Sequence, residues 1–212
     1  MWRTTVMHRR EAVATTATDH LPPTHPDGVD DFEVQRPQDG VGPLFHRRYS
    51  IRIRDSELSA SELMGKLKTD LNQAVPTKFA RFQRVFGEDS RLRLGDEYVV
   101  RMPGPWDGPV RVIADDERSF RLATLSGHLE AGQIEFRSRP EDEHVVFEIE
   151  SWARSGDRLS NLLYHRVRMA KEVQLHMWTS FLEGVTQLAG GRMSGGVTIE
   201  TERVEEPFGG RA

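Results

Sequence analysis

The chain has 212 residues and a formal net charge of -4, and its composition is 37% hydrophobic and 29% charged. Such a chain can bury a full core, and its charge leaves no basic excess for phosphates, which argues against nucleic acid as a partner. It has no cysteines, which excludes disulfides, cysteine-ligated zinc, iron–sulfur clusters and thiol nucleophiles.

The first 45 residues differ from the rest of the chain. Prolines, glycines and aspartates interrupt them and no periodic apolar pattern survives, so we expect an extended or disordered arm. Residues 1–19 lack the apolar run of a secretory signal, which leaves a weak transit peptide or an upstream start codon with Met7 as the true start. No stretch approaches the roughly 20 apolar residues that span a membrane. We therefore expect a cytoplasmic protein without a membrane span.

The next predicted elements are one strand and two helices. Residues 49–53 alternate between apolar and polar types, which is typical of a half-buried strand. Ser59 and Glu62 form a capping-box pair at the start of a helix whose leucines recur every four residues, and Pro76 ends it. Three phenylalanines at i, i+3 and i+7 within residues 79–86 predict a second, short helix.

Strands and one long helix are expected after residue 90. Short apolar runs separated by turn residues predict the strands, and their short connections favour antiparallel neighbours. One apolar stripe kept for about eight turns predicts a helix from Gly156 to Leu188. Val197 and Ile199 suggest an extra edge strand in the tail. The predicted strands are Leu92–Met102, Val110–Ala114, Phe120–Leu125, Gln133–Arg137 and His144–Trp152.

This order of elements is the layout of the helix-grip fold, an α+β fold in which a curved antiparallel sheet wraps around a long C-terminal helix. Two segments add a more specific match, FRLATLSGHLEAGQIEFR at residues 120–137 and FEIESWARSG at residues 147–156. They resemble an uncharacterised family, domain of unknown function 1990, which belongs to the START-like, or SRPBCC, superfamily. The matching positions are Thr124, Leu125, Gly127, His128, Gly132, Phe136, Phe147, Ile149, Trp152 and Arg154.

The resemblance covers roughly residues 47–188. It divides the chain into an arm at 1–45, a helix-grip domain at 46–189 and a tail at 190–212. Gln133 stands where the family pattern has Glu, and Glu135 follows two residues later. The superfamily implies a small apolar or lipid-like ligand in a cavity between sheet and helix, and the family itself implies no activity and no cofactor.

The turn around His128 is the richest local cluster of reactive groups. His128 beside Glu130, or with Glu135, has the residue types of an acid–base pair near neutral pH. The alternative is structural, with Gly127 supplying the turn and His128 capping strand ends by hydrogen bonds. No metal is expected, because the histidines are scattered and a metal needs three or four convergent ligands.

Other side chains are candidate ligand contacts. Trp106 stands in a Pro-flanked turn, where it lines a pocket mouth or folds back on the core. Trp152 and Arg154 lie between the last strand and the long helix, where we expect them to close or gate the cavity. Arg154 then holds a ligand carboxylate or phosphate, or else pairs with a nearby acid. Met177 lines an adaptable pocket or packs in the core, and Thr124 belongs to the matched turn.

We therefore predict a binding module that holds a small, mostly apolar molecule between sheet and helix. Two alternatives stay open. One is an enzyme of the cyclase, dehydratase or hydrolase type that uses His128 with Glu130 or Glu135. The other is an interaction protein whose interior is filled by its own side chains. An imidazole in hydrogen-bond reach of a carboxylate in the cavity wall favours the enzyme.

Overall fold

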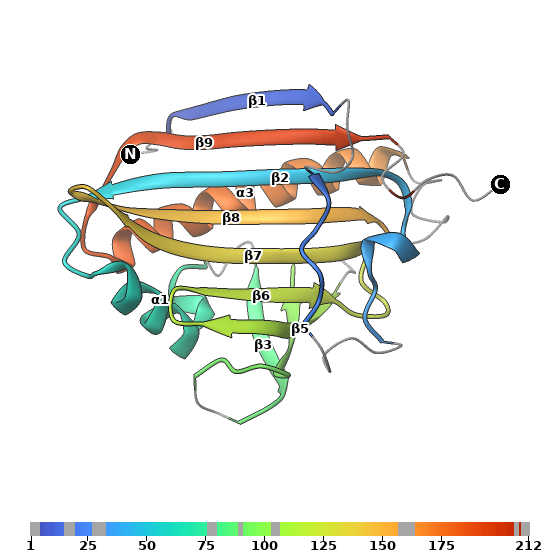
Figure 1. The fold of residues 1–212 in the computed structure, drawn as a ribbon, viewed down its shortest axis with the longest axis horizontal. Coiled ribbons are helices and arrows are strands. Elements are labelled where there is room, and N and C mark those ends of the chain that lie inside the picture. Colours follow the sequence, from blue (N-terminus) through green and yellow to red (C-terminus); the bar gives the residue numbers. More distant parts are fainter. Residues whose placement is uncertain are drawn as a thin grey trace.

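A nine-stranded sheet with a long helix on one side dominates the computed structural model (Figure 1). The structure describes residues 5–14, 20–26, 33–75, 80–88, 91–102, 107–156, 164–205 and 208. The elements in chain order are β1 (Met7–Val13), η2 (Pro37–Asp39), β2 (Val41–Arg54), α1 (Ala60–Thr69), η3 (Leu71–Gln73), β3 (Arg81–Phe86), β4 (Glu97–Arg101), β5 (Asp107–Asp116), β6 (Ser119–Thr124), β7 (Glu130–Glu141), β8 (His144–Ser155), α3 (Tyr164–Leu188) and β9 (Arg192–Val204).

The sheet order is β1-β9-β2-β8-β7-β6-β5-β4-β3. Neighbouring strands are antiparallel, except that β1 and β9 run parallel. The long helix α3 lies behind the sheet in Figure 1, while residues 20–26 cross in front of it. This is the helix-grip arrangement predicted from the order of the elements. α3 ends at Leu188 as predicted, and the seven residues before Tyr164 lie outside the described residues.

The two faces of the sheet have different compositions because successive side chains of a strand point to opposite faces. The inner face, which faces α3, carries apolar residues such as Ile51 of β2 and Phe147 of β8. Trp178 and Phe181 of α3 pack there, with ring centroids 5.6 Å (Trp178) and 5.5 Å (Phe181) from that of Phe136. The outer face carries many of the charged residues of these strands. Burial of the inner apolar surface is the main term that holds helix and sheet together.

The capping box predicted for the first helix is confirmed. The Ser59 hydroxyl accepts a hydrogen bond from the Glu62 backbone, and the Glu62 carboxylate accepts one from the Ser59 backbone at 2.8 Å. The helix ends at Thr69 rather than near Pro76. The reason is that Asp70 adopts an extended conformation and caps the short 3-10 helix η3 through the Asn72 backbone.

The prediction of a short helix around residues 79–86 is wrong, because residues 81–86 form strand β3. Its backbone pairs with β4, and the Asn72 side chain bonds both the N–H and the C=O of Phe82, at 2.8 and 2.9 Å. Phe82 is buried on the inner face, whereas Phe86 is 67% exposed. Positions i and i+4 share a face in a regular strand as well as in a helix, so the spacing of residues 82 and 86 cannot distinguish the two. In β3 a register shift between Arg84 and Phe86 turns Phe86 to the other face, opposite Glu97. Phe79 lies outside the described residues.

The predicted edge strand in the tail exists as β9, but it does not lie at the edge. It is hydrogen-bonded to β2 on one side and to β1 on the other, in register from Met7 with Val197. Gly195 and Gly196 have positive φ where the pairing of β9 with β2 shifts register, a conformation that glycine adopts without strain. The division at residues 45 and 189 stays a prediction, although the sheet takes strands from all three of its parts.

Candidate functional site

A cluster of polar side chains interrupts the apolar inner face where α3 covers the sheet. It consists of Arg47 on β2, Ser151 on β8, Glu130 on β7 and Gln174 on α3, and we call it the inner cluster. Arg47 and Ser151 are direct cross-strand partners and are only 7% and 5% exposed. Cross-strand partners have Cβ atoms about 5 Å apart. The guanidinium and the hydroxyl therefore lie side by side on the face of the sheet that α3 covers.

Arg47 uses little of its hydrogen-bonding capacity. Its Nη1 donates to Gln174 Oε1 at 3.2 Å and lies 3.9 Å from Glu130 Oε1, which is longer than a hydrogen bond. Gln174 Nε2 in turn donates to the other Glu130 oxygen at 3.2 Å. The guanidinium also lies over the Phe45 ring, 4.7 Å from its centroid. Its Nε and Nη2 donate no hydrogen bond to the described residues.

Ser151 and Trp178 add buried donors without partners. Ser151 Oγ and Trp178 Nε1 are both fully buried and form no hydrogen bond with any described residue. A buried polar group without a partner destabilises the folded state by about 1–3 kcal/mol, and native proteins contain few such groups. Tyr49 lies two residues beyond Arg47 on the same face. Burial raises the pKa of its hydroxyl, and the nearby charge of Arg47 lowers that pKa in part. The inner cluster thus combines one cation and one carboxylate with the Gln174 amide and the Ser151 hydroxyl, and the Tyr49 hydroxyl belongs to the same face.

Among the described residues, the predicted ligand contacts lie at separate places in the fold. The Thr124 hydroxyl accepts from Gly132 N at 2.9 Å and lies 3.1 Å from Gln35 O, so it holds backbone. Met177 is buried in the core between helix and sheet. Trp106 lies outside the described residues.

His128 contacts backbone rather than a carboxylate. Its Nδ1 lies 2.9 Å from Glu130 N and 3.0 Å from Glu130 O, while the Glu130 carboxylate turns to Gln174. Burial lowers the pKa of the imidazole. Glu135 points to the outer face, where it pairs with Arg137 at 3.5 Å. In the described structure no hydrogen bond joins this imidazole to either carboxylate.

Trp152 and Arg154 also lie on the outer face, away from the space between sheet and helix. Trp152 stacks on His46, with centroids 5.2 Å apart and ring planes 9° from parallel. Arg154 Nε donates to Gly42 O at 2.8 Å, and its Nη1 donates to Pro37 O at 3.1 Å. Burial lowers the pKa of the Arg154 guanidinium. These contacts hold the chain that enters β2 against β8.

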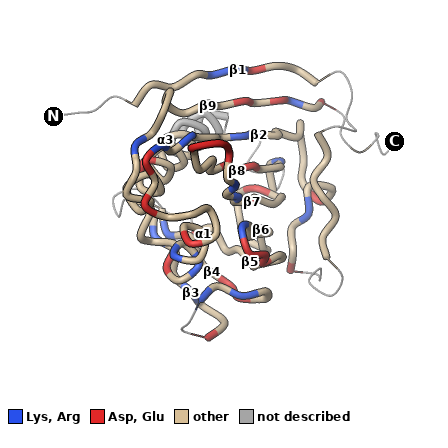
Figure 2. Tube along the Cα trace, turned by 60° about the vertical axis from the view of Figure 1, so that its left-hand side comes forward, with Lys and Arg blue, Asp and Glu red and all other residues tan. Residues whose placement is uncertain are grey.

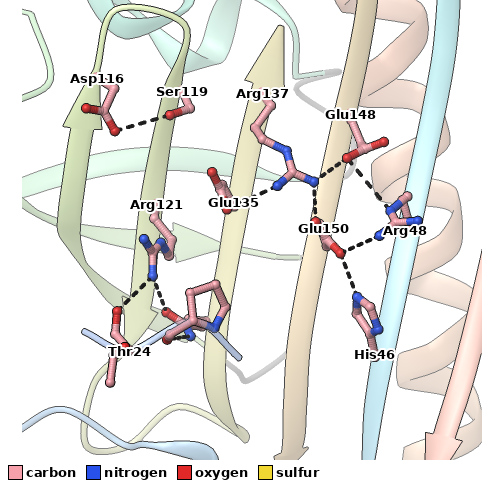
Figure 3. A network of polar contacts seen from close by, with 12 residues as sticks. Thr24, His46, Arg48, Asp116, Ser119, Arg121, Glu135, Arg137, Glu148 and Glu150 are labelled. Carbon is pink, nitrogen blue, oxygen red and sulfur yellow. Dashed lines mark hydrogen bonds and ion pairs between the residues drawn. The ribbon is translucent and has the colours of Figure 1, made fainter. Parts of the chain in front are cut away.

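The outer face carries an ion-pair network that sequence reasoning missed (Figure 3). At its centre, Glu150 accepts hydrogen bonds from His46 at 2.7 Å, from Arg48 at 2.8 Å and from Arg137. Burial alone would raise the pKa of Glu150, but the bonds from His46, Arg137 and Arg48 outweigh it and lower the pKa to about 2. Basic and acidic residues are interspersed over the fold (Figure 2). The alternation of charged residues in the predicted strands was the signal for this network.

Residues 20–26, which we call the strap, cross this network (Figures 1 and 3). His20 Nδ1 lies 3.1 Å from His46 Nδ1, and Arg121 donates to Thr24 O at 3.2 Å. Gln133, the position that departs from the family pattern, donates to Pro23 O at 2.6 Å. No local sequence pattern predicts the strap, because its contacts are with residues far away in the chain.

One cleft of about 200 Å³ lies elsewhere, between α1, η3, β3 and β4. Its lining includes Lys68, whose ammonium is fully buried and pairs with Asp115 at 2.5 Å. None of its lining residues belongs to the inner cluster. Among the described residues, no group of three or more His, Asp or Glu side chains could hold a metal ion. In the same part of the chain, no helix is long and apolar enough to cross a membrane.

Comparison with known proteins agrees with the fold. Residues 73–183 match the family described as a domain of unknown function (DUF1990). The hypothetical protein jhp0584 from Helicobacter pylori is 10% identical, with a TM-score of 0.50 over 84% of this chain and 99% of that one. Norcoclaurine synthase from Thalictrum flavum is 12% identical, with a TM-score of 0.49 over 79% and 94%.

A conserved protein from Geobacillus kaustophilus is 13% identical, with a TM-score of 0.47 over 70% of this chain and 98% of that one. No curated protein matches the chain. At these identities a structural likeness carries information about the fold alone.

Proposed function

The chain belongs to the family called domain of unknown function 1990 and has the helix-grip fold; from this premise, we propose that it binds a small, mostly apolar molecule between the sheet and α3. The observation that carries the proposal is the inner cluster, where Arg47 donates one hydrogen bond within the described structure and the Ser151 hydroxyl is fully buried without a partner there. Small-molecule sites are mostly apolar cavities with a few convergent polar groups. The inner cluster supplies such groups.

Energetics support a ligand more than an ordinary core at this position. Burying a polar group without a partner is unfavourable, and a buried charge without full compensation is more so. An apolar residue at position 151 would avoid the cost of the unpartnered hydroxyl. Ile149 and Ile199 flank the cluster on the same face of neighbouring strands and supply apolar surface for the body of a ligand. A molecule with one polar end satisfies both kinds of surface.

The second half of α3 limits where such a molecule fits. Phe136, Phe147, Trp178 and Phe181 form a continuous aromatic contact there, with centroids 5.5–6.3 Å apart. Their rings fill the space between helix and sheet, as in the alternative of an interior filled by its own side chains. We therefore place the ligand toward the first half of α3, beside the inner cluster.

Binding is favoured over catalysis by the contacts of the candidate acid–base residues. His128 Nδ1 is engaged by the Glu130 backbone, and Glu135 lies on the other side of the sheet. A general acid–base pair needs its two groups in reach of one substrate.

Native mass spectrometry of the purified full chain tests the proposal. We expect a co-purifying small molecule, or a raised melting temperature with members of a panel of lipids and aromatic metabolites. Ser151→Leu replaces the hydroxyl of the cluster by a bulky apolar side chain and should abolish binding. Ser50→Leu is its matched control, because Ser50 lies on the outer face of the adjacent strand β2. No bound molecule and no thermal shift, or equal loss in both variants, would contradict the proposal.

A further inference from the structure

We propose that the ligand is a monocarboxylic acid with an apolar body, and that its carboxylate binds to Arg47 and Ser151. This inference rests on the proposed function and names its ligand class. It depends on three properties of the inner cluster: the unused donors of the guanidinium, the hydroxyl opposite it, and the incomplete compensation of the Arg47 charge.

The donors of Arg47 match a carboxylate in number and shape. A guanidinium has five N–H donors in a planar fork, which fits the two oxygens of a carboxylate. Here only Nη1 donates a hydrogen bond within the described structure, to Gln174 at 3.2 Å. The Nε and Nη2 edges stay available for two parallel hydrogen bonds. An alcohol or a ketone, with a single oxygen, would use fewer of these donors.

Ser151 places a further donor at the same point. Its position directly opposite Arg47, on the neighbouring strand and the same face, brings its hydroxyl beside the guanidinium. That hydroxyl is buried and has no partner among the described residues. Tyr49, on the same face two residues along β2, is 3% exposed and adds a third kind of donor. A ligand oxygen that accepts from these groups satisfies them together.

The charges of the cluster favour an anion. Glu130 is the carboxylate nearest to Arg47 in the cluster, yet it stays 3.9 Å away and its side chain is 34% exposed. Its other oxygen is occupied by Gln174. The Arg47 charge, on a side chain that is 8% exposed, is therefore only partly compensated. A ligand carboxylate supplies the missing charge, whereas an amine would face repulsion from Arg47.

Matched acids and alcohols test this inference on the full chain. The probes are dodecanoic acid with dodecan-1-ol, and 2-naphthoic acid with 2-naphthylmethanol, and the affinity is measured by calorimetry at neutral pH. We expect the acid of at least one pair to bind ten- to a hundredfold more tightly than its alcohol, as about 1.5–3 kcal/mol for hydrogen bonds to a charged group implies.

Substitutions of single arginines test which residue causes the higher affinity for the acid. Arg47→Gln should remove the advantage of the acid over the alcohol, and Arg47→Lys should keep part of it, because it retains the charge without the fork. Arg54→Gln is the matched control. Arg54 lies on the same strand, but it is exposed on the outer face and should leave the ratio unchanged. Melting curves of all three variants confirm that each is folded.

The outcomes separate the ligand class from the function. If alcohols bind as tightly as acids, or if Arg47→Gln leaves the ratio unchanged, the ligand class is wrong while the binding function stands. If dodecylamine binds more tightly than dodecanoic acid, Glu130 is the head-group partner and the ligand class is again wrong. If no acid, alcohol or amine binds, the proposed function and its ligand class are both overturned.

Discussion

Strands β2 and β8 together bury one charged group on each face of the sheet, Arg47 on the inner face and Glu150 on the outer face, but the two faces provide different partners for it. On the outer face, Glu150 accepts from one histidine and two arginines, and its side chain is 6% exposed. On the inner face, Arg47 is almost as buried but has one amide at hydrogen-bond distance and a carboxylate at 3.9 Å. Burial does not distinguish these positions, whereas the number of partners does.

This difference indicates separate roles for the two faces. The Glu150 carboxylate, with three donors around it, stabilises the native arrangement and also lies under the strap, although Arg48 Nε and Arg121 Nε on the same face form no hydrogen bond with any described residue. A buried charge with unused donors gains from a further partner. If the comparison is right, changes on the outer face should act on folding and changes on the inner face should act on binding.

Removing the centre of the outer network should have the largest effect on stability. Glu150→Ala leaves Arg48, Arg137 and His46 without their shared acceptor, and we expect the free energy of unfolding to fall by about 3 kcal/mol. Denaturant titration measures the change. The matched control is Glu202→Ala on the same face, since Glu202 makes no ion pair with any described residue. Equal, small effects would show that the network is not structural.

The same carboxylate predicts an acid dependence of stability. The pKa of Glu150 falls from 4.5 to about 2 on folding. A lowered carboxyl pKa contributes stability above the unfolded value and loses it as the pH falls through the folded value. As the pH falls from 4.5 to 2, protonation of Glu150 should lower the free energy of unfolding by about 3 kcal/mol. Denaturant titrations at several pH values should show that Glu150→Gln lacks this part of the pH dependence. If the free energy of unfolding of the variant changes with pH as steeply as that of the parent, the result argues against the network.

His128 is a polar group of a third kind, half-buried and hydrogen-bonded to backbone. Burial lowers the pKa of its imidazole, so the folded protein favours the neutral form. The unfolded chain then binds a proton first, and stability should decline as the pH falls through the ordinary histidine value of about 6.5. Melting temperatures between pH 8 and 5 should show a smaller decline in His128→Asn, while exposed His176→Asn should behave like the parent.

Ser151→Ala should have the smallest effect on stability, and one of opposite sign. It removes a buried hydroxyl that has no partner in the described structure, so the ligand-free protein should be unchanged or up to about 1 kcal/mol more stable. The affinity for a carboxylic acid should fall at the same time. A clear loss of stability in denaturant titration would mean that the hydroxyl has a structural role, and the contrast between the two faces would fail.

Local patterns predicted the elements that form locally. The capping box at Ser59 and the alternation in β2 and β8 are properties of neighbouring residues, and the structure has them. The spacing of Phe82 and Phe86 was compatible with both helix and strand, and pairing with β4 decided between them. Tertiary context selects the outcome where a short apolar pattern is ambiguous.

The candidate site was less predictable because it depends on contacts between distant residues. Arg47 and Gln174 are separated by 127 positions, and no local motif links them. The family motif drew attention to His128, Trp152 and Arg154, whose contacts hold backbone or the outer face. A motif marks positions that a fold needs, and those positions need not be the ones that bind.

The place of β2 between β8 and β9 has a consequence for synthesis of the chain. Arg48 of β2 meets Glu150 and Glu200, which follow it by 102 and 152 positions. While a ribosome is making the intervening residues, β2 has neither lateral neighbour and keeps an apolar face and two open edges. Such long sequence separations slow folding and favour association between nascent chains. Full sheet closure must therefore wait until the residues of β9 leave the exit tunnel.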